Sequence, residues 1–305
     1  MKTCVIMSVY NGEKYIGEQL DSIFSQNYKG ELFVYIRDDG STDNTLEYLR
    51  ERSEYSELNL IIKCGDNRGA AGSFLEAIKN APDADIYAFC DQDDVWETGK
   101  IRAFQTAIES EKTLMPVLWI SNYNVVDKDL KTVESNRLVE PVTDDLYALF
   151  YNNIPGCVMA FNKALLHKMR QLNLASIRMH DIMALNIALL TGKMIYDSKS
   201  YVNYRQHENN VIGYKHKKIK PFNWIKDKIK LFVNKESYSI SEYTEQVLVN
   251  FSGYMSEYKK SEYMVIRDYK KNIINKLRLL SKNYTRAKIN RTTISIRCKI
   301  LFGLM

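Results

Sequence analysis

The sequence has no run of about 18 apolar residues, so no membrane-spanning helix is expected. The short apolar run from Thr3 to Val9 is too brief for the core of a signal peptide and is followed by no cleavage site, so we expect a first strand there. The five cysteines are odd in number and widely spaced, which argues against a disulfide framework or a zinc site. We therefore expect a cytoplasmic protein with free thiols.

Two common nucleotide-binding loops are also missing. No Gly-x-x-x-x-Gly-Lys-Ser/Thr loop is present, and no Gly-x-Gly-x-x-Gly follows the first apolar run. P-loop ATP hydrolysis and dinucleotide redox chemistry therefore lose support. With 305 residues, of which 45% are hydrophobic and 26% charged, the chain still has the composition of a globular protein with one large domain and an appendage.

The first 122 residues alternate short apolar runs with amphipathic segments. The apolar runs predict strands at Cys4–Val9, Leu32–Ile36, Leu58–Ile62, Ile86–Cys90 and Val117–Ile120. The segments between them predict helices at Lys14–Ser25, Asn44–Arg52, Gly72–Lys79 and Lys100–Glu109. This alternation predicts an α/β protein with a mainly parallel, Rossmann-like sheet flanked by helices, and ligands at the carboxyl ends of the strands.

After Asn122 the alternation becomes less regular. We expect a hairpin near Asp127–Lys131 and further helices at Asp144–Phe150, Lys163–Leu172 and Ile182–Leu190. Strands are expected at Cys157–Phe161, Met194–Tyr196 and Tyr201–Arg205.

Acidic residues follow three of the predicted strands. The sequence Asp91-Gln92-Asp93-Asp94 comes directly after the fourth strand, and similar polar turns span residues 37–43 and 65–69. Neighbouring carboxylates repel one another unless a cation offsets their charge, and Mg²⁺ or Mn²⁺ binds through one or two carboxylates plus substrate phosphates. The alternative is a set of solvated turns that only cap the following helices, and each turn taken alone leaves that alternative open.

Taken in order, the motifs resemble those of family 2 glycosyltransferases with the GT-A fold. The resemblance covers about residues 3–213 and rests on five segments, which are Val5–Glu13, Arg37–Ser41, Asp91–Trp96, Met179–Asp181 and Tyr204–Val211. The combination DQDDVW, MHD and YRQHENNV is similar to the rhamnosyltransferase branch that builds bacterial surface polysaccharides, including capsules. The Gln-x-x-Arg-Trp signature of processive synthases is absent, which favours single additions of sugar.

The resemblance implies a nucleotide-sugar donor and a divalent metal, Mg²⁺ or Mn²⁺. The residues that it assigns to the donor are Val9, Tyr10, Glu13, Asp38, Asp39, Asp66, Arg68, Asp91 and Gln92. Val9 and Tyr10 would line the base pocket and Asp39 would contact the nucleoside. The implied metal ligands are Asp93, Asp91 and His207. Asp181 occupies the place of the catalytic base.

The implied reaction is a metal-dependent hexosyl transfer with inversion, in which one carboxylate deprotonates the acceptor hydroxyl and a cation stabilises the departing diphosphate. Two of these assignments have structural alternatives. Asp181 precedes an apolar helical pattern and could be its N-cap, while His207 could be a surface histidine.

The resemblance also divides the chain. We expect a GT-A domain over residues 1–213, with a donor half at 1–122 and an acceptor half at 123–213, and a basic helical extension over 214–305. Residues 215–305 contain 21 Lys and Arg against 7 Asp and Glu. Pro221–Phe232 mixes aromatic and basic residues, which suggests peripheral contact with the inner face of a membrane; a helical hairpin packed on the domain is the alternative.

The functional hypothesis from the sequence is transfer of L-rhamnose from dTDP-L-rhamnose to a saccharide acceptor, with a polyprenyl-diphosphate lipid expected as its carrier. A UDP-hexose donor, for glucosyl or galactosyl transfer, is a close alternative, because the base-contacting residues would serve thymine and uracil alike. A sugar nucleotidyltransferase is a more distant alternative, since Tyr10–Lys14 only partly fits its loop. Nucleic-acid binding has no accompanying module signature.

Overall fold

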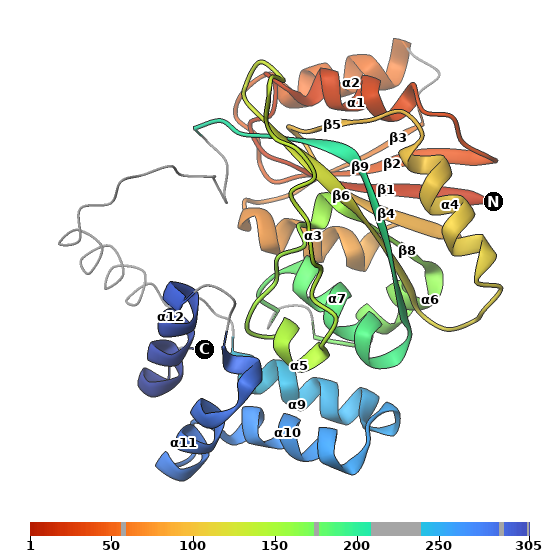
Figure 1. Ribbon diagram of the computed structural model, residues 1–305. Coiled ribbons are helices and arrows are strands. Elements are labelled where there is room, and N and C mark those ends of the chain that lie inside the picture. Colours follow the sequence, from red (N-terminus) through yellow and green to blue (C-terminus); the bar gives the residue numbers. More distant parts are fainter. Residues whose placement is uncertain (56–58, 174–176, 209–238, 287–289, 304) are drawn as a thin grey trace. The chain divides into compact units, whose positions relative to one another are not determined.

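A computed structural model describes residues 1–55, 59–173, 177–208, 239–286, 290–303 and 305 (Figure 1). The chain forms two compact units. The first comprises Met1–Leu174 and Arg178–Gln206, and the second comprises Ala175–Ile177 and His207–Met305. The predicted domain boundary at residue 213 and the basic segment Pro221–Phe232 lie outside the described residues. The division at residue 122 stays a prediction.

One half of the sheet in the first unit is entirely parallel. Its strands are β1 (Lys2–Val9), β2 (Glu31–Asp38), β3 (Leu60–Cys64) and β4 (Ile86–Asp91), in the order β3-β2-β1-β4. They are linked by α1 (Ile16–Phe24), α2 (Thr45–Tyr55) and α3 (Gly69–Asn80). These elements confirm the alternation predicted from the sequence.

The direction of the crossovers places the helices on both faces of this half. The chain moves from β1 outward to β3 and then returns past β1 to β4. Because parallel crossovers are right-handed, α3 lies on the face opposite to α1 and α2, as Figure 1 shows. The strand order therefore reverses between β1 and β4, which is where open α/β sheets bind ligands.

The other half of the sheet is mixed. It adds β8 (Met159–Asn162), β6 (Val117–Val126), β9 (Lys193–Arg205) and β5 (Val95–Trp96) in that order, and β7 (Thr132–Glu134) pairs with β6. β6 runs parallel to β9, whereas the other pairs in this half are antiparallel. The helices here are α4 (Lys100–Ser110), α5 (Asp145–Ala148), α6 (Lys163–Met169) and α7 (His180–Thr191).

Three local expectations differ from the structure. The chain at Cys157 forms a short 3₁₀ turn, η1 (Gly156–Val158), before β8 starts at Met159. The two short strands expected near residues 194–205 are one long strand, β9. The two-residue strand β5 was not predicted, because Val95 and Trp96 are too few to show a period.

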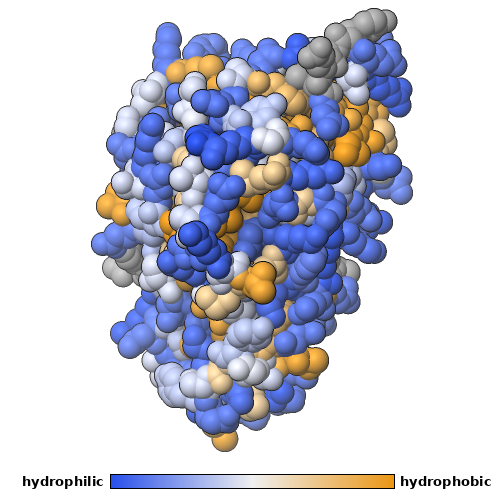
Figure 2. Space-filling view, turned by 90° about the vertical axis from the view of Figure 1, so that its right-hand side faces the viewer, coloured by the Kyte–Doolittle hydropathy of each residue, from blue (hydrophilic) through white to orange (hydrophobic). Residues whose placement is uncertain are grey.

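The core of the first unit is aromatic and aliphatic. Its largest fully buried side chains come from both halves of the sheet, and they include Phe33, Tyr87, Phe89, Trp119 and Phe161. The face drawn in Figure 2 is mostly hydrophilic, with apolar side chains in separate small groups. Cys4, Cys90 and Cys157 are buried free thiols, and burial was expected for Cys4 and Cys90 from the apolar runs that contain them.

The second unit is helical where the structure describes it. Its helices are α9 (Ile240–Phe251), α10 (Glu257–Asp268), α11 (Ile273–Ser281) and α12 (Asn290–Phe302), with 3₁₀ turns η3 (Ser252–Tyr254) and η4 (Asn283–Thr285). Ser239, Ser256 and Asn272 are the N-caps of α9, α10 and α11, and each side chain accepts a backbone N–H of the first turn. Among the described helices, none combines the length and hydropathy that crossing a bilayer requires.

Candidate functional site

The pairing register brings the polar turns to one edge of the sheet. Val9 at the end of β1 pairs with Asp38 at the end of β2, and Asp38 pairs with Cys64 at the end of β3. On the other side of β1, Ser8 pairs with Asp91 at the end of β4. The turns that begin at residues 10, 39, 65 and 92 therefore lie side by side, at the point where the strand order reverses.

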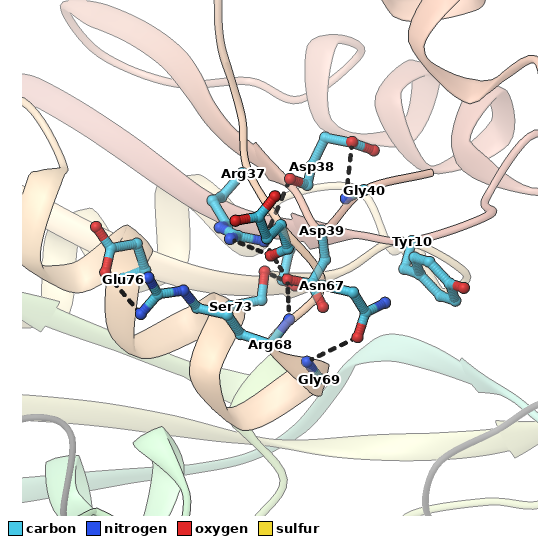
Figure 3. A network of polar contacts seen from close by, with 12 residues as sticks. Tyr10, Arg37, Asp38, Asp39, Gly40, Asn67, Arg68, Gly69, Ser73 and Glu76 are labelled. Atoms are coloured by element: carbon cyan, nitrogen blue, oxygen red, sulfur yellow. Dashed lines mark hydrogen bonds and ion pairs between the residues drawn. The ribbon is translucent and has the colours of Figure 1, made fainter. Parts of the chain in front are cut away.

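Buried charges hold the turns after β2 and β3 together (Figure 3). Asp39 is 2% exposed, forms an ion pair with the buried guanidinium of Arg37 and accepts the backbone N–H of Arg68 at 2.9 Å. Arg37 also donates to the carbonyl of Asp66 at 2.8 Å. Fully buried Asp38 accepts the amides of Gly40 and Ser41 at 3.1 Å each. These contacts fix the shape of the edge before any ligand arrives.

The remaining residues that the sequence assigned to a nucleoside differ in exposure. Tyr10 is 46% exposed, and Figure 3 shows its ring beside the network of Arg37 and Asp39. The side chain of Arg68 is 60% exposed and lies 3.8 Å from the carboxylate of Glu76 on α3. Val9, in contrast, is fully buried in β1. The nucleoside roles assigned to these residues stay predictions.

Two further predicted donor residues join the first turn to its neighbours. The amide of Gln92 makes two hydrogen bonds with the backbone of Tyr10, accepting its N–H at 2.8 Å and donating to its carbonyl at 3.0 Å. A Cβ atom on Gly12 would lie 2.6 Å from the oxygen of that amide, so a larger residue there would displace the Gln92 side chain. Glu13 accepts the N–H of Asn44 at 2.9 Å and so supports the turn before α2.

An acidic cluster forms at the end of β4. Ligand atoms of Asp91, Asp94 and Cys157 all lie within 4.8 Å of one another. Burial and the neighbouring charges of Asp93 and Asp181 raise the pKa of Asp91 to about 7. Asp94 is fully buried, and its Oδ2 has no hydrogen-bond partner among the described residues. The sequence had paired Asp91 with Asp93; in the structure Asp94 also belongs to the acidic cluster, and the metal role of Asp93 stays a prediction.

A buried lysine lies against this cluster. Lys100 of α4 is fully buried, donates to the carbonyl of Cys157 at 2.6 Å and has its ammonium 3.5 Å from the centre of the Trp96 ring. Burial lowers the pKa of Lys100 to about 8, and the charges of Asp94 and Asp91 act in the opposite direction. Lys100 therefore offsets part of the carboxylate charge from beneath.

Arg205, the last residue of β9, anchors the loop after β4. Its guanidinium donates to the carbonyl of Asp93 at 2.8 Å and to that of Lys128 at 2.9 Å, and it pairs with Glu18 of α1. Its backbone N–H donates to Asp94 at 3.1 Å. Arg205 also stacks over Tyr15 at 4.6 Å and is 2% exposed. One side chain thus joins three segments far apart in the sequence.

Asp181 lies in the first turn of α7, one residue after the helix begins. The N-cap is Met179, so Asp181 is not the cap that was the alternative explanation. Its Oδ2 accepts the side-chain amide of Asn152 at 3.0 Å, and burial raises its pKa to about 6. The Asp181 charge is one cause of the raised pKa of Asp91, so the Asp181 carboxylate lies near the cluster at the end of β4.

The neighbouring His180 is enclosed by apolar groups. It stacks on Phe74 with ring centres 3.9 Å apart and meets the edge of Phe89 at 4.6 Å, and neither ring nitrogen has a partner among the described residues. Burial lowers its pKa to about 3, so the imidazole is neutral at pH 7. A Cβ atom on Gly156 would lie 2.3 Å from Nε2 of His180, so Gly156 makes room for the ring.

His207 belongs to the second unit, so its predicted role as a metal ligand stays a prediction.

Sequence reasoning missed the roles of Arg37, Lys100, Cys157 and Arg205 as the residues that support the site. Arg37 and Arg205 lie inside the motifs Arg37–Ser41 and Tyr204–Val211, so their positions in these motifs could have indicated a role in the site. Lys100 and Cys157 carried no such signal, because only the fold brings them beneath β4.

Comparison with known proteins gives a consistent result. The family described as "Glycosyl transferase family 2" matches residues 4–170. The dTDP-rhamnosyl transferase RfbG of Shigella flexneri is 30% identical over 224 residues, which cover 68% of this chain and 73% of RfbG.

Two other similar proteins are named with UDP sugars, whereas RfbG is named for a dTDP sugar. The Escherichia coli UDP-Glc:alpha-D-GlcNAc-diphosphoundecaprenol beta-1,3-glucosyltransferase WfaP is 35% identical over 125 residues, covering 41% of this chain and 47% of WfaP. A crystal structure of S. aureus TarS 1–349 in complex with UDP-GlcNAc superimposes with a TM-score of 0.61 at 18% identity, covering 100% of this chain and 82% of that one. At this identity the likeness shows the GT-A fold.

Proposed function

The chain belongs to glycosyl transferase family 2, and we propose that it transfers L-rhamnose from dTDP-L-rhamnose to a saccharide acceptor in the synthesis of a bacterial cell-surface polysaccharide. The choice of donor is supported by the similarity to RfbG over 224 residues. Family membership also removes the sugar nucleotidyltransferase that the sequence had left open. A nucleotide sugar is then the donor substrate, held along the edge formed by the ends of β1, β2 and β4.

One observation carries this proposal to specific residues. Asp181 on α7 and Asp91 at the end of β4 are close enough in space for one carboxylate to raise the pKa of the other. The sheet register independently places Asp91 beside the turns after β1 and β2. A base and a diphosphate-binding carboxylate are thus available in the same site, on separate elements, as group transfer between two substrates requires.

In the proposed reaction Asp181 is the general base. The acceptor hydroxyl gives its proton to the Asp181 carboxylate while its oxygen forms a bond to the anomeric carbon of the donor. The bond between that carbon and the diphosphate oxygen breaks at the same time, so the configuration at the carbon inverts and the nucleoside diphosphate leaves. The raised pKa of Asp181, about 6, makes it a better proton acceptor than an ordinary carboxylate while leaving it ionised at pH 7. Asn152 holds its orientation.

The carboxylates at the end of β4 fit a divalent cation. Asp91 and Asp94 offer oxygen atoms, which Mg²⁺ and Mn²⁺ prefer, and the unpartnered Oδ2 of Asp94 is available within the cluster. A bound cation would neutralise charge on the leaving diphosphate. Asp91 is the residue we expect to hold it, with Asp93 as the second predicted ligand, while Arg205 keeps the loop in place.

A second donor class has a specific basis. WfaP is named for a UDP-Glc donor and the TarS structure contains UDP-GlcNAc, so a UDP-hexose donor is the alternative. The WfaP name also contains a diphosphoundecaprenol acceptor, which supports our proposal that the acceptor saccharide here is linked to a lipid diphosphate. Since thymine and uracil share one hydrogen-bonding edge, the base contacts would serve either donor.

A donor panel separates the two classes. Thermal unfolding of the full chain would be followed with dTDP-rhamnose, UDP-glucose, UDP-galactose and GDP-mannose, each with and without Mn²⁺. A donor at about 100 times its dissociation constant adds roughly 2.7 kcal/mol to the free energy of unfolding. We expect stabilisation by dTDP-rhamnose that depends on Mn²⁺. Stabilisation by UDP-hexoses alone would select the alternative donor, and stabilisation by GDP-mannose alone would contradict both.

A further inference from the structure

The apolar side chains of α11 face solvent. Ile273, Ile274 and Leu277 are 61%, 72% and 58% exposed, and Leu279 is the helix residue that is buried. Residues three and four positions apart share one side of a helix, so the three exposed side chains form a continuous ridge opposite Leu279. Exposed aliphatic side chains in a group of this kind mark a binding surface more often than isolated ones do.

The end of α12 extends this apolar surface. The ammonium of Lys276 on α11 donates to the carbonyl of Leu301 at 3.2 Å, which brings the last turn of α12 next to α11. Leu301 and Phe302 in that turn are 46% and 72% exposed. We call the group Ile273, Ile274, Leu277, Leu301 and Phe302 the apolar ridge.

The stretch of sequence that contains the apolar ridge carries charge of a single sign. From Tyr269 to Met305 the sequence contains ten Lys and Arg and no Asp or Glu. Lys276 and Arg278 flank Leu277 in the sequence, so at about 100° per residue they lie on the two sides of the ridge. Long cationic side chains in these places can reach past the apolar residues toward anions.

We propose that the apolar ridge and its flanking cations dock on the surface of an anionic lipid bilayer. Aliphatic and aromatic side chains would enter the boundary between headgroups and acyl chains, and Lys276 and Arg278 would pair with anionic headgroups. A second copy of the chain is a poor occupant, because a symmetric contact would bring cation against cation. Nucleic acid would use the charge but would leave the aliphatic ridge in water. The surface lies on α11 and α12, whereas the segment Pro221–Phe232 that the sequence had suggested lies outside the described residues.

Flotation of the purified full chain with vesicles tests this proposal without any donor or acceptor. The probes are phosphatidylcholine vesicles and vesicles of phosphatidylcholine with about 30% phosphatidylglycerol. The test variant is Ile274→Glu/Leu277→Glu. We expect the native chain to float with the anionic vesicles, and the variant to bind them at least about tenfold less, because it loses apolar burial and adds repelling charge. Lys276→Gln is expected to weaken binding about fivefold, on the anionic vesicles only.

Val249→Glu provides the matched control. Val249 lies on α9 of the same unit, is 71% exposed and is outside the apolar ridge. It should float as the native chain does, and circular dichroism should show all variants folded. Equal flotation of the ridge variant and the native chain would overturn the proposal. So would a change from dimer to monomer in the ridge variant, measured by light scattering, since that would assign the ridge to a second copy.

Discussion

Two groups of side chains, one in each unit of this protein, are placed in opposite ways. In the first unit Arg37, Asp39, Lys100 and Arg205 are almost entirely removed from solvent and bound to other groups. In the second unit Ile274 and Phe302 are each 72% exposed. Both arrangements cost stability, through desolvated charge in one unit and hydrated apolar surface in the other. We propose a ligand for each: a nucleotide sugar at the edge of the sheet and a lipid surface at the apolar ridge.

We expect the largest effect from removing charge at the end of β4. Asp91→Asn keeps the size of the side chain but removes the carboxylate that a cation needs. We expect turnover to fall by about 10²- to 10³-fold and the Mn²⁺-dependent stabilisation by donor to disappear. Steady-state kinetics and thermal unfolding with donor measure both.

Asp83→Asn is the control, because Asp83 precedes β4 at its other end and pairs with Lys163 in solvent at 2.6 Å. It should change turnover less than twofold, because exposed ion pairs contribute little to stability. An equal loss in both variants would mean that charge on β4 acts on folding and not on the donor.

Arg205→Met tests whether buried charge in the first unit supports the site. The substitution removes the donors to the carbonyls of Asp93 and Lys128, so the loop carrying Asp91 and Asp93 loses its anchor. Losing charge-assisted hydrogen bonds of this kind costs about 2 kcal/mol, which we expect as a roughly thirtyfold weaker apparent affinity for Mn²⁺ with a smaller change in the KM of the acceptor.

Lys193→Met removes an exposed cation at the other end of the same strand, where Lys193 pairs with Glu111 at 2.8 Å. It should leave the Mn²⁺ affinity unchanged. If Arg205→Met lowered stability but left the Mn²⁺ affinity at its native value, Arg205 would be structural and would not position the loop.

Gly156→Ala is expected to have a smaller effect, on stability. The added Cβ would lie 2.3 Å from Nε2 of His180, whose ring is packed between Phe74 and Phe89. We expect a loss of about 1–3 kcal/mol in the free energy of unfolding, typical of an overpacked core. Urea unfolding measures it.

Gly253→Ala is the matched control, because a Cβ atom there has no neighbour within 4 Å. In a chain that already carries His180→Ala, Gly156→Ala should lower the free energy of unfolding by less than it does in the native chain. Independent, additive costs would show that Gly156 does not make room for His180.

The pH dependence of kcat/KM tests the role of Asp181. Near pH 7 its expected effect is the smallest of these predictions. The raised pKa of Asp181, about 6, means that protonation removes the base as the pH falls through 6. At saturating Mn²⁺, which would hold Asp91 ionised, we expect kcat/KM for the acceptor to be flat at higher pH and to fall about tenfold per unit below 6, as for one essential carboxylate. A profile still flat at pH 5 would contradict the assignment.

The fold was predictable where periodicity is strong. The parallel strands and their helices follow from apolar runs such as Ile86–Phe89 and from the spacing of Ile16, Leu20 and Ile23, which are all buried in α1. The convergence of the turns after β1, β2 and β4 followed from the rule that parallel strands end at one edge. The candidate residues themselves, such as Asp91 and Asp181, came from motifs.

What supports those residues was not predictable from the sequence. Arg205 meets Glu18 across 187 positions of the chain, and Lys100 reaches Cys157 across 57. Such pairs depend on tertiary packing and leave no local pattern. The grouping of Asp94 with Asp91 and Cys157 likewise depends on how the loop after β4 is held. The sequence alone does not distinguish one aspartate of this motif from another.

Turnover of Asp181→Asn with dTDP-rhamnose and a lipid-linked acceptor tests the central claim most directly. Asparagine keeps the shape of the side chain and one oxygen that can accept from Asn152, but it cannot take a proton from the acceptor hydroxyl. We predict a loss of at least about 10³-fold in kcat, while Mn²⁺-dependent stabilisation by the donor stays as in the native chain. Turnover within about tenfold of native would contradict the role of Asp181 as the base, and loss of donor binding in this variant would contradict the separation of the base from the donor-holding residues.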